Sequence, residues 1–269
     1  MLIALDVGNS DITVGIVRGG EVSSSRAAPT RPTATAAELD ATLDELLQLD
    51  GTTLDETGDI VMASVVPAMS TALAEVAGQR GIRLLTADST NIPIPIRVDQ
   101  PASVGDDRLV NALAAARIHG KPAIVVDLGT ATTFDVVAAD GAFIGGAIAP
   151  GLGIALDALS ARTAQLPRIG LVMPPRAIGR DTVSAMQSGA LIGYLGLVRE
   201  LVRAMSAELA LDGGDPPKVI LTGGYSNADW ARAIPGVDAI DPLLTLRGLA
   251  ILHAEVGREV GSQESVAQA

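Results

Sequence analysis

The sequence predicts an α/β protein built from two related halves, and three observations support this. Short aliphatic segments typical of buried strands alternate with longer segments of helical spacing along the 269 residues. A strand, an acidic glycine turn, a second strand and a glycine hairpin occur twice, in the same order. Hydrophobic residues make up 48% of the chain and aromatic residues only 2%, so a large core must be aliphatic.

The first copy of this unit begins the chain. Leu2–Leu5 is expected to be a buried strand, Asp6–Ser10 a turn, and Ile12–Val17 a second strand. Gly19-Gly20 then predicts a hairpin into a short strand near Glu21–Arg26. The rest of this half predicts helices over Ala37–Leu49, Ser70–Arg80 and Gly105–His119, strands over Asp59–Ser64 and at Leu84-Leu85, and an extended loop over Asn91–Pro101.

The second copy lies 121 residues further along. This offset separates Asp6 from Asp127 and also Gly20 from Gly141. One Asp-x-Gly turn is common, whereas two in register within strand–turn–strand units indicate an internal duplication. The second half predicts strands at Ala123–Val126, Phe134–Ala138, Ala142–Ile144 and Val219–Leu221, and helices within Pro150–Ala164, over Thr182–Leu211 and from about Leu246. We expect halves at residues 1–118 and 119–258, followed by a flexible tail at 259–269.

Charge and composition exclude several classes of function. The formal net charge of −12 argues against a nucleic-acid-binding protein, which needs clustered Lys and Arg. The chain has no cysteine and two isolated histidines, so disulfides, thiolate chemistry and a histidine metal cluster are excluded. No signal-peptide pattern and no apolar run of about 18 residues occur, so a cytoplasmic location is expected, without membrane partners.

The two acidic turns have the chemistry of a phosphate site. Backbone N–H groups in a glycine turn can cradle phosphate oxygens, and nearby hydroxyls add donors: Ser10, Thr13, Thr130, Thr132 and Thr133. Asp6 and Asp127 would repel phosphate unless a cation lay between, and Mg²⁺ prefers one or two carboxylates with phosphate oxygens and water. Alternatively, each aspartate only stabilises its turn.

A second candidate site is Gly105-Asp106-Asp107-Arg108, at the start of a predicted helix. Asp107 could accept the proton of an attacking hydroxyl, and Arg108 could hold an anionic group of the acceptor. The simpler reading is a helix cap beside a solvated arginine. Thr222-Gly223-Gly224 could support a base or a ribose, although a glycine pair after a strand is more often just a turn.

The duplicated units resemble the phosphate loops of the actin-like superfamily, which includes sugar kinases, acetate kinase and the heat-shock chaperone ATPases. The remaining motifs resemble type III pantothenate kinase more narrowly, in order and over nearly the whole chain. They are Asp6–Ser10, Gly105–Ala112, Asp127–Asp135, Gly145–Gly151, Ala185–Gly189 and Asp241–Leu249.

This resemblance implies a fold of two ribonuclease-H-like halves with ATP in the cleft between them. It also implies ATP-dependent phosphorylation of pantothenate to 4′-phosphopantothenate, the first step of coenzyme A biosynthesis. The implied cofactors are Mg²⁺ with ATP and a monovalent cation, K⁺ or NH₄⁺. The resemblance further implies a homodimer, with the acceptor site at or near the subunit interface.

The resemblance also assigns roles to residues. Asp107 matches the proton acceptor, and Asp127 matches the aspartate that binds the monovalent cation; Asp6 would position Mg²⁺, directly or through water. The positions that match pantothenate-binding residues are Gly105, Asp106, Asp107, Arg108 and Thr182. Those that match ATP-binding residues are Asp6, Val7, Gly8, Asn9, Ser10, Asp11, Ile12, Thr13 and Thr130.

Two positions depart from the family pattern near the acceptor site. Val98 stands where the family often has a tyrosine, and Asp106 stands where a small apolar residue is usual. Val98 leaves open a kinase of the same fold that acts on another small alcohol. A non-catalytic regulator is the other alternative, because relatives of this family are described as accessory factors for transcription.

Overall fold

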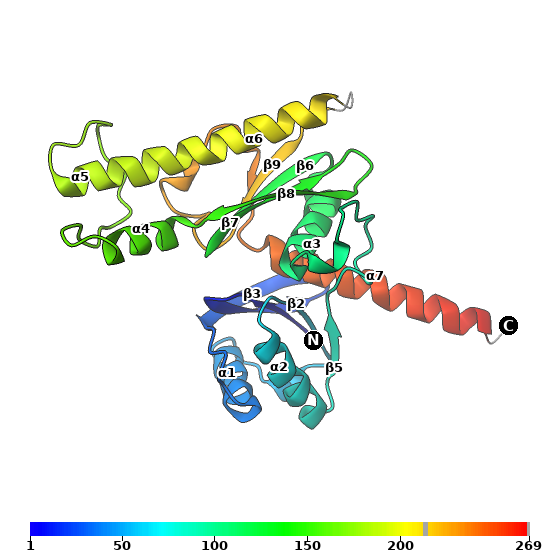
Figure 1. The fold of residues 1–269 in the computed structure, drawn as a ribbon. Helices are drawn as coiled ribbons and strands as arrows, with labels where there is room; N and C mark the ends of the chain where they lie inside the picture. Colours follow the sequence, from blue (N-terminus) through cyan, green and yellow to red (C-terminus); the bar gives the residue numbers. More distant parts are fainter. Residues whose placement is uncertain (212–214, 268–269) are drawn as a thin grey trace. The chain divides into compact units, whose positions relative to one another are not determined.

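The computed structural model describes residues 1–211 and 215–267, which form two compact units (Figure 1). The first unit comprises Met1–Arg117 together with Leu243–Ala269, and the second comprises Ile118–Pro242. Each unit contains one five-stranded mixed sheet.

The sheet of the first unit has the strand order β3-β2-β1-β4-β5. Its strands are β1 (Leu2–Val7), β2 (Asp11–Arg18), β3 (Glu21–Pro29), β4 (Asp59–Ser64) and β5 (Arg83–Thr86). Strand β1 pairs antiparallel with β2 and parallel with β4. Aliphatic side chains fill the core around this sheet, as the composition predicted: Ile3, Leu43, Ile60 and Leu73 are fully buried.

Helices cover this sheet. They are α1 (Ala36–Gln48), α2 (Pro67–Arg80), α3 (Asp106–Ala114), which continues into the π-helical turn η3 (Ala115–His119), and α7 (Leu244–Ala267). Two 3₁₀ turns also occur, η1 (Leu54–Glu56) and η2 (Pro101–Ser103). In Figure 1, α1 and α2 lie side by side, and α3 lies against α7.

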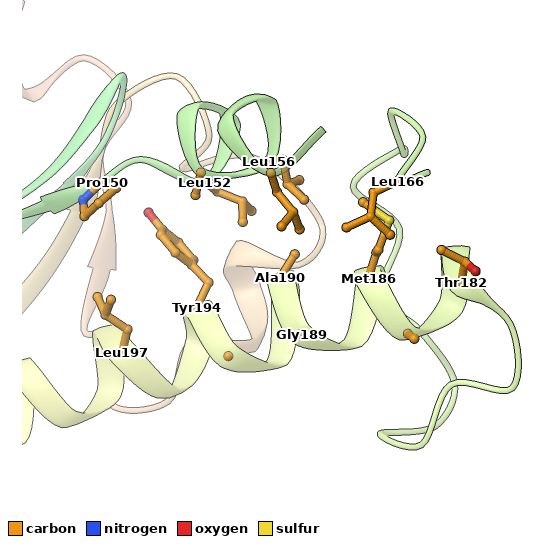
Figure 2. Close-up of a pocket in the computed structure, with 14 residues that line it drawn as sticks. Pro150, Leu152, Leu156, Leu166, Thr182, Met186, Gly189, Ala190, Tyr194 and Leu197 are labelled. Carbon is orange, nitrogen blue, oxygen red and sulfur yellow. The ribbon is translucent and has the colours of Figure 1, made fainter. Parts of the chain in front are cut away.

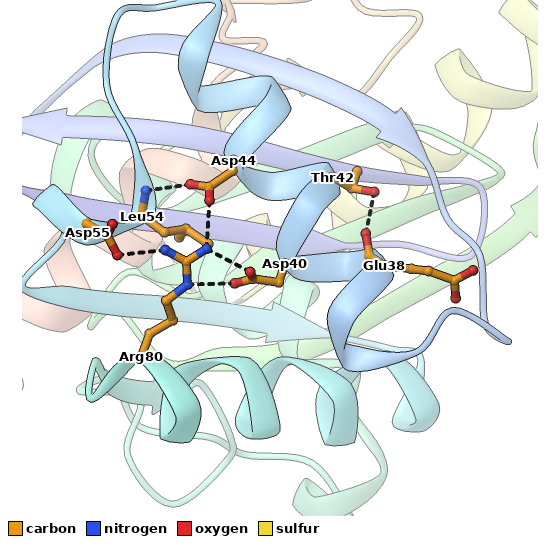
Figure 3. Close-up of polar contacts among 7 residues, drawn as sticks. All are labelled: Glu38, Asp40, Thr42, Asp44, Leu54, Asp55 and Arg80. Carbon is orange, nitrogen blue, oxygen red and sulfur yellow. Dashed lines mark hydrogen bonds and ion pairs between the residues drawn. The ribbon is translucent and has the colours of Figure 1, made fainter.

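Arg80 ties α1, η1 and α2 together in the first unit (Figure 3). Its guanidinium contacts carboxylate oxygens of Asp40 at 2.7 Å, Asp44 at 2.6 Å and Asp55 at 2.6 Å. These hydrogen bonds keep the pKa of Arg80 above its ordinary value. Asp44 also accepts the Leu54 N–H at 2.8 Å, which fixes the chain after α1.

The second unit repeats the topology of the first. Its sheet order is β10-β9-β6-β7-β8, with strands β6 (Ala123–Leu128), β7 (Ala131–Val137), β8 (Phe143–Pro150), β9 (Lys218–Thr222) and β10 (Ala239–Ile240). The central strand β6 is antiparallel to β7 and parallel to β9, as β1 is to β2 and β4. The duplication predicted from the sequence is therefore present in the fold.

The two acidic turns differ in length by one residue. Val7 pairs with Ile12 across the first turn, which leaves four residues between them. Leu128 pairs with Thr132 across the second turn, which leaves three. The offset of 121 residues therefore holds for β1 and β6 but falls to 120 for β2 and β7.

The helices of the second unit are α4 (Leu152–Ala161), α5 (Thr182–Gln187), the π-helical turn η4 (Ser188–Ile192) and α6 (Gly193–Leu211), with a 3₁₀ turn η5 (Ala231–Ala233). Helix α5, the π turn η4 and helix α6 follow one another without a break. This agrees with the single long helix predicted over Thr182–Leu211, except for the π turn in its middle. Tyr194 of α6 packs edge-on against Trp230, their ring centroids 5.6 Å apart, in the core of this unit.

The C-terminal helix packs with the first unit, although its sequence follows the second half. Leu246, Leu249 and Leu252 are buried, and a Cβ on Gly15 of β2 would lie 2.9 Å from Leu246 Cδ1. The compact units thus differ from the sequence boundaries at 118/119 and 258. Helix α7 runs to Ala267, and the end of the predicted tail, 268–269, lies outside the described residues.

Neither histidine is isolated in the fold. His119 Nε2 lies 3.0 Å from Asp241 Oδ2 in the second unit, and His253 Nε2 lies 2.8 Å from Asp59 Oδ2 in the first. In the part of the chain that the structure describes, we find no helix with the length and apolar character needed to cross a membrane.

Candidate active site

The first acidic turn lies at the carboxyl end of β1. Asp6 is opposite Thr13 of β2 and Ala63 of β4. The Gly8 N–H donates to the Asp11 carbonyl at 2.9 Å, and the Thr30 hydroxyl donates to the Gly8 carbonyl at 2.7 Å. These bonds hold the turn in a fixed shape, which suits a turn that presents backbone groups to a ligand.

The residues of this turn differ in exposure. Asn9, Ser10 and Asp11 are exposed, whereas the side chains of Val7 and Ile12 are each 1% exposed and belong to the core of the first unit. Any contact between ATP and these two predicted residues would therefore involve their backbone atoms alone.

Asp107 lies in the first turn of α3, where its carboxylate folds back over the helix N-terminus. Its Oδ1 accepts the Arg108 N–H at 2.8 Å. A Cβ at Gly105 would stand 2.5 Å from the same oxygen, so only glycine leaves space for this arrangement. The simpler reading of Asp107 as the helix cap is therefore wrong: the N-cap of α3 is Gly105, with no side-chain cap bond. Asp107 lies inside the first turn and bonds one N–H there, through Oδ1.

The first turn and the start of α3 lie at the same end of the sheet. The Val65 N–H, just after β4, donates to the Val7 carbonyl at 3.1 Å. The position of a Gly105 Cβ would be 3.6 Å from Val65 Cγ1. Val65 therefore lies next to both Val7, where the first turn begins, and Gly105, the N-cap of α3, at the carboxyl ends of β1 and β4.

Burial raises the pKa values of both aspartates at the start of α3. For Asp107 the hydrogen bond from the Arg108 N–H and the Arg108 charge oppose part of that rise. For Asp106 the pKa rises to about 6, because burial is reinforced by the negative charges of Asp107 and Asp88. Asp88 was not singled out by the sequence pattern, in which Asp-Ser-Thr at 88–90 indicates only a turn.

Asp127 occupies the equivalent place in the second unit. It lies near the carboxyl end of β6, opposite Thr133 of β7 and Thr222 of β9. Gly223 follows Thr222 with φ +87°, and a Cβ there would overlap Asp127 Oδ1 and the Leu128 backbone. The weak Thr222-Gly223-Gly224 signal thus marks a turn that closes against the carboxylate of Asp127.

Thr130 lies in the second turn, between β6 and β7. The junction of β8 and α4 contacts this turn. The Gly151 N–H donates to the Thr130 carbonyl at 3.1 Å, and a Cβ on Gly151 would overlap the carbonyl oxygens of Gly129 and Thr130. Glycine at 151 therefore allows the start of α4 to contact the second turn directly.

Thr132 does not present its hydroxyl to a ligand. Its side chain is fully buried, and its Oγ1 forms a hydrogen bond with the Tyr194 hydroxyl. The expectation that Thr132 supplies a phosphate donor is therefore wrong, because its position on β7 points the side chain into the core. Burial and the negative charge of Asp127 raise the pKa of Tyr194, against the effect of the Thr132 bond.

Thr182 lies elsewhere in the second unit, at the start of α5. It lines an apolar cavity of about 690 Å³ between α4 and the α5–η4–α6 helix. Figure 2 shows Thr182 near one end of this cavity, beside Met186, and Tyr194 near the other, beside Pro150. Twelve residues of helix separate Thr182 from Tyr194, about 18 Å along the axis, so Thr182 lies well away from the second turn of its own unit.

The oxygen donors of the two turns fit hard cations bound together with phosphate. In the described residues, no group of three or more His, Cys, Asp or Glu side chains is arranged to hold a metal. Mg²⁺ is commonly held by one or two carboxylates plus phosphate oxygens and water, and Asp6 could serve in this way. Asp127 lies at the equivalent place in the second unit, where the Gly223 backbone packs closely against its Oδ1, and its carboxylate is the oxygen ligand that this unit could offer a cation.

Comparison with known proteins decides the family. The family model described as type III pantothenate kinase matches residues 2–204. The chain belongs to the type III pantothenate kinase family. A type III pantothenate kinase from Moorella thermoacetica is 42% identical over 94% of this chain and 98% of its own length. One from Thermomicrobium roseum is 41% identical over 97% of this chain and 100% of its own length.

Solved structures confirm the fold. A protein from Campylobacter jejuni, described as a Baf family transcriptional activator, has a TM-score of 0.61 at 19% identity, covering 95% of this chain and 99% of its own. MreB5 of Spiroplasma citri, bound to ADP, has a TM-score of 0.53 at 13% identity, covering 97% and 98%. With the repeated sheet topology, these likenesses show the duplicated ribonuclease-H-like fold of actin-like ATPases.

Proposed function

We propose that this member of the type III pantothenate kinase family phosphorylates pantothenate with ATP, giving 4′-phosphopantothenate and ADP in the first step of coenzyme A biosynthesis. The observation that carries the proposal is the partly buried Asp107 carboxylate, held at the start of α3 at the same sheet end as the Asp6 turn. Near-full-length similarity to type III pantothenate kinases supports the choice of substrate.

In this reaction Asp107 accepts the proton of the primary hydroxyl as that oxygen attacks the γ-phosphorus. The bond from the γ-phosphorus to the bridging oxygen of ADP breaks, so one proton and one phosphoryl group are transferred. The raised pKa of Asp107 makes it a stronger base than an ordinary aspartate. The Arg108 guanidinium would hold the pantothenate carboxylate, and Gly105 and Asp106 would shape the same site.

We assign ATP binding to the two turns. The Asp6–Thr13 turn and Thr130 would contact phosphate oxygens, with Val7 and Ile12 contributing backbone atoms only. Mg²⁺ would neutralise phosphate charge near Asp6. The Asp127 carboxylate would bind K⁺ or NH₄⁺.

Thr182 supports a homodimer. It would contact pantothenate, yet it lies about 18 Å along its helix from Tyr194, which bonds Thr132 of β7, next to the second turn. Aliphatic side chains stand exposed along the helices that form the cavity, on Ile154, Leu159, Val183 and Ile192. A second copy that covered this apolar surface would bury these side chains and bring its own acceptor residues to Thr182.

Release of ADP with and without pantothenate tests the reaction. We expect turnover that depends on pantothenate and is faster in K⁺ than in Na⁺. Asp107→Asn should lower kcat by 10²-fold or more, whereas Asp99→Asn, at an exposed aspartate nearby, should not. Parent-like turnover by Asp107→Asn would refute the assignment of the base.

The same assay separates the two alternatives. The half-buried Val98, where the family often has tyrosine, favours a test of other small primary alcohols as acceptors. ADP release with one of these, but not with pantothenate, would identify a kinase of different specificity. Absence of ATP turnover with every acceptor would favour the regulator.

Mixing two impaired variants, assayed at pantothenate concentrations well below the KM of Thr182→Val, tests the shared site. Asp107→Asn and Thr182→Val each remove one side of it, so in a mixed dimer one of the two sites retains both residues. Activity regained after mixing, together with a dimeric mass by light scattering, would support the proposal. A monomeric mass and no regained activity would contradict it.

A further inference from the structure

The segment just before Thr182 is held by an unusually complete set of contacts. Asp181 is the N-cap of α5, and its carboxylate accepts the Ser184 N–H at 2.9 Å and the Ser184 hydroxyl at 2.9 Å. In return, Ser184 Oγ accepts the N–H groups of Asp181 at 3.2 Å and Arg180 at 3.1 Å. The chain on both sides of Thr182 is therefore fixed by one reciprocal pair of side chains.

Gly179 secures the same segment from the other side. A Cβ at this position would overlap the backbone of Ser184 and Ala185, so the approaching chain lies directly on the first turn of α5. The hydroxyl of Ser188 donates to the Ala177 carbonyl one turn further along. These contacts hold an exposed threonine in place at the edge of the apolar cavity.

We propose that Asp181 is a positioning residue, whose capping bonds with Ser184 hold Thr182 in the orientation that contacts the acceptor. This inference rests on the proposed function, because it takes Thr182 to be a pantothenate contact. Without the cap, the first turn of α5 frays and Thr182 samples other orientations, since an unsatisfied helix N-terminus is the part of a helix that opens most readily. The expected consequence is weaker acceptor binding, with the phosphoryl-transfer step itself little changed.

The first test compares the pantothenate kinetics of three variants in the full-length protein. Asp181→Ala should raise the KM for pantothenate about fivefold or more and change kcat less than twofold. Asp181→Ser, which keeps a capping oxygen, should restore most of the parent KM. Thr35→Ala removes the matching cap of α1, where Thr35 and Glu38 form the same reciprocal bonds in the first unit; it should leave the KM unchanged.

A double variant shows whether Asp181 acts through Thr182. Thr182→Val should raise the KM, and adding Asp181→Ala to it should produce no further increase. Amide hydrogen exchange on the parent and Asp181→Ala should show faster exchange at residues 184 and 185 in the variant.

Three outcomes would overturn the inference while the proposed function stands: an unchanged KM in Asp181→Ala despite faster exchange, an equal rise in Thr35→Ala, or additive effects in the double variant. Loss of turnover in the parent enzyme itself would instead refute the proposed function, and this inference with it.

Discussion

At the residue scale, the start of α3 brings like charges together. The charges of Asp107 and Asp88 act on Asp106, and burial raises the pKa values of both Asp106 and Asp107. Asp88 is held in a turn by the Thr90 hydroxyl and N–H, which lower its pKa, so it stays ionised and continues to act on Asp106. At neutral pH the ionised Asp106 carboxylate therefore destabilises the folded state, because burial disfavours its charge.

Asp106→Asn should raise stability at neutral pH. The folded pKa of about 6 lies above the ordinary value of 3.8, so the folded state binds its proton more tightly than the unfolded state. The resulting loss in the free energy of unfolding is absent near pH 3.5, grows as the pH rises to 6, and is complete above pH 6. We expect a higher Tm for the variant at pH 7.5 and little difference at pH 4.

Thermal unfolding at both pH values checks this, with Asp99→Asn as the control at an exposed aspartate. An equal rise in Tm at pH 4 would show that the burial of an ionised carboxylate at Asp106 is not the cause.

Residue types and motif order pick out Asp6, Asp107 and Asp127 as candidates from the sequence, and their roles stay predictions. The sequence could not reveal that Asp88 acts on Asp106, because they meet only through tertiary folding. Nor could it show that the Thr132 hydroxyl bonds Tyr194 inside the core, since Thr132 stands in a motif whose other hydroxyls are more exposed.

At the scale of elements, the two acidic turns share a strand arrangement but differ in what closes them. The first turn has four residues between its paired strand ends and is closed by Thr30. The second has three, and Gly151 and Gly223 pack directly on it. The constant offset of the strands was visible in the sequence, whereas the shorter second turn was not, because Gly20 and Gly141 return to the 121-residue offset.

Gly223→Ala should disable the second turn. Its new Cβ would overlap the Asp127 carboxylate, and φ is +87°. Gly236→Ala is a matched control, since its φ is +79° and nothing lies within 4 Å of a Cβ there. We expect the control to lose about 1 kcal/mol of stability from backbone strain alone. Gly223→Ala should lose more and also lose its response to K⁺.

Urea unfolding and ADP release in K⁺ and Na⁺ measure these effects. A Gly223→Ala protein with the stability and K⁺ response of the control would mean that the Asp127 carboxylate tolerates displacement.

At the scale of the whole molecule, the chain passes between the two units twice, after Arg117 and after Pro242. The duplication predicted two halves in succession, yet the final helix completes the first unit. The Thr245 hydroxyl donates to Asn111 Oδ1 at 2.8 Å, and Arg117 forms an ion pair with Glu255 at 2.9 Å. Periodicity located α7 but could not assign it to a unit, because its apolar face would suit either sheet.

Gly248→Ala tests how much the first unit depends on this helix. A Cβ there would lie 2.5 Å from the Val110 carbonyl and 2.7 Å from Val110 Cγ1, so α3 and α7 would have to separate. We expect a loss of about 1–3 kcal/mol from overpacking. Gly257→Ala lies on the same helix with nothing within 4 Å, and should instead gain up to about 1 kcal/mol from helix propensity.

Amide hydrogen exchange then shows which strands lose stability in Gly248→Ala. Because α7 packs with β1 and β4, Gly248→Ala should reduce protection in those strands. Protection in β6 and β9, which belong to the second unit, should change less. Equal loss of protection in both sheets would show that the two units unfold together, and that α7 stabilises the molecule as one cooperative whole.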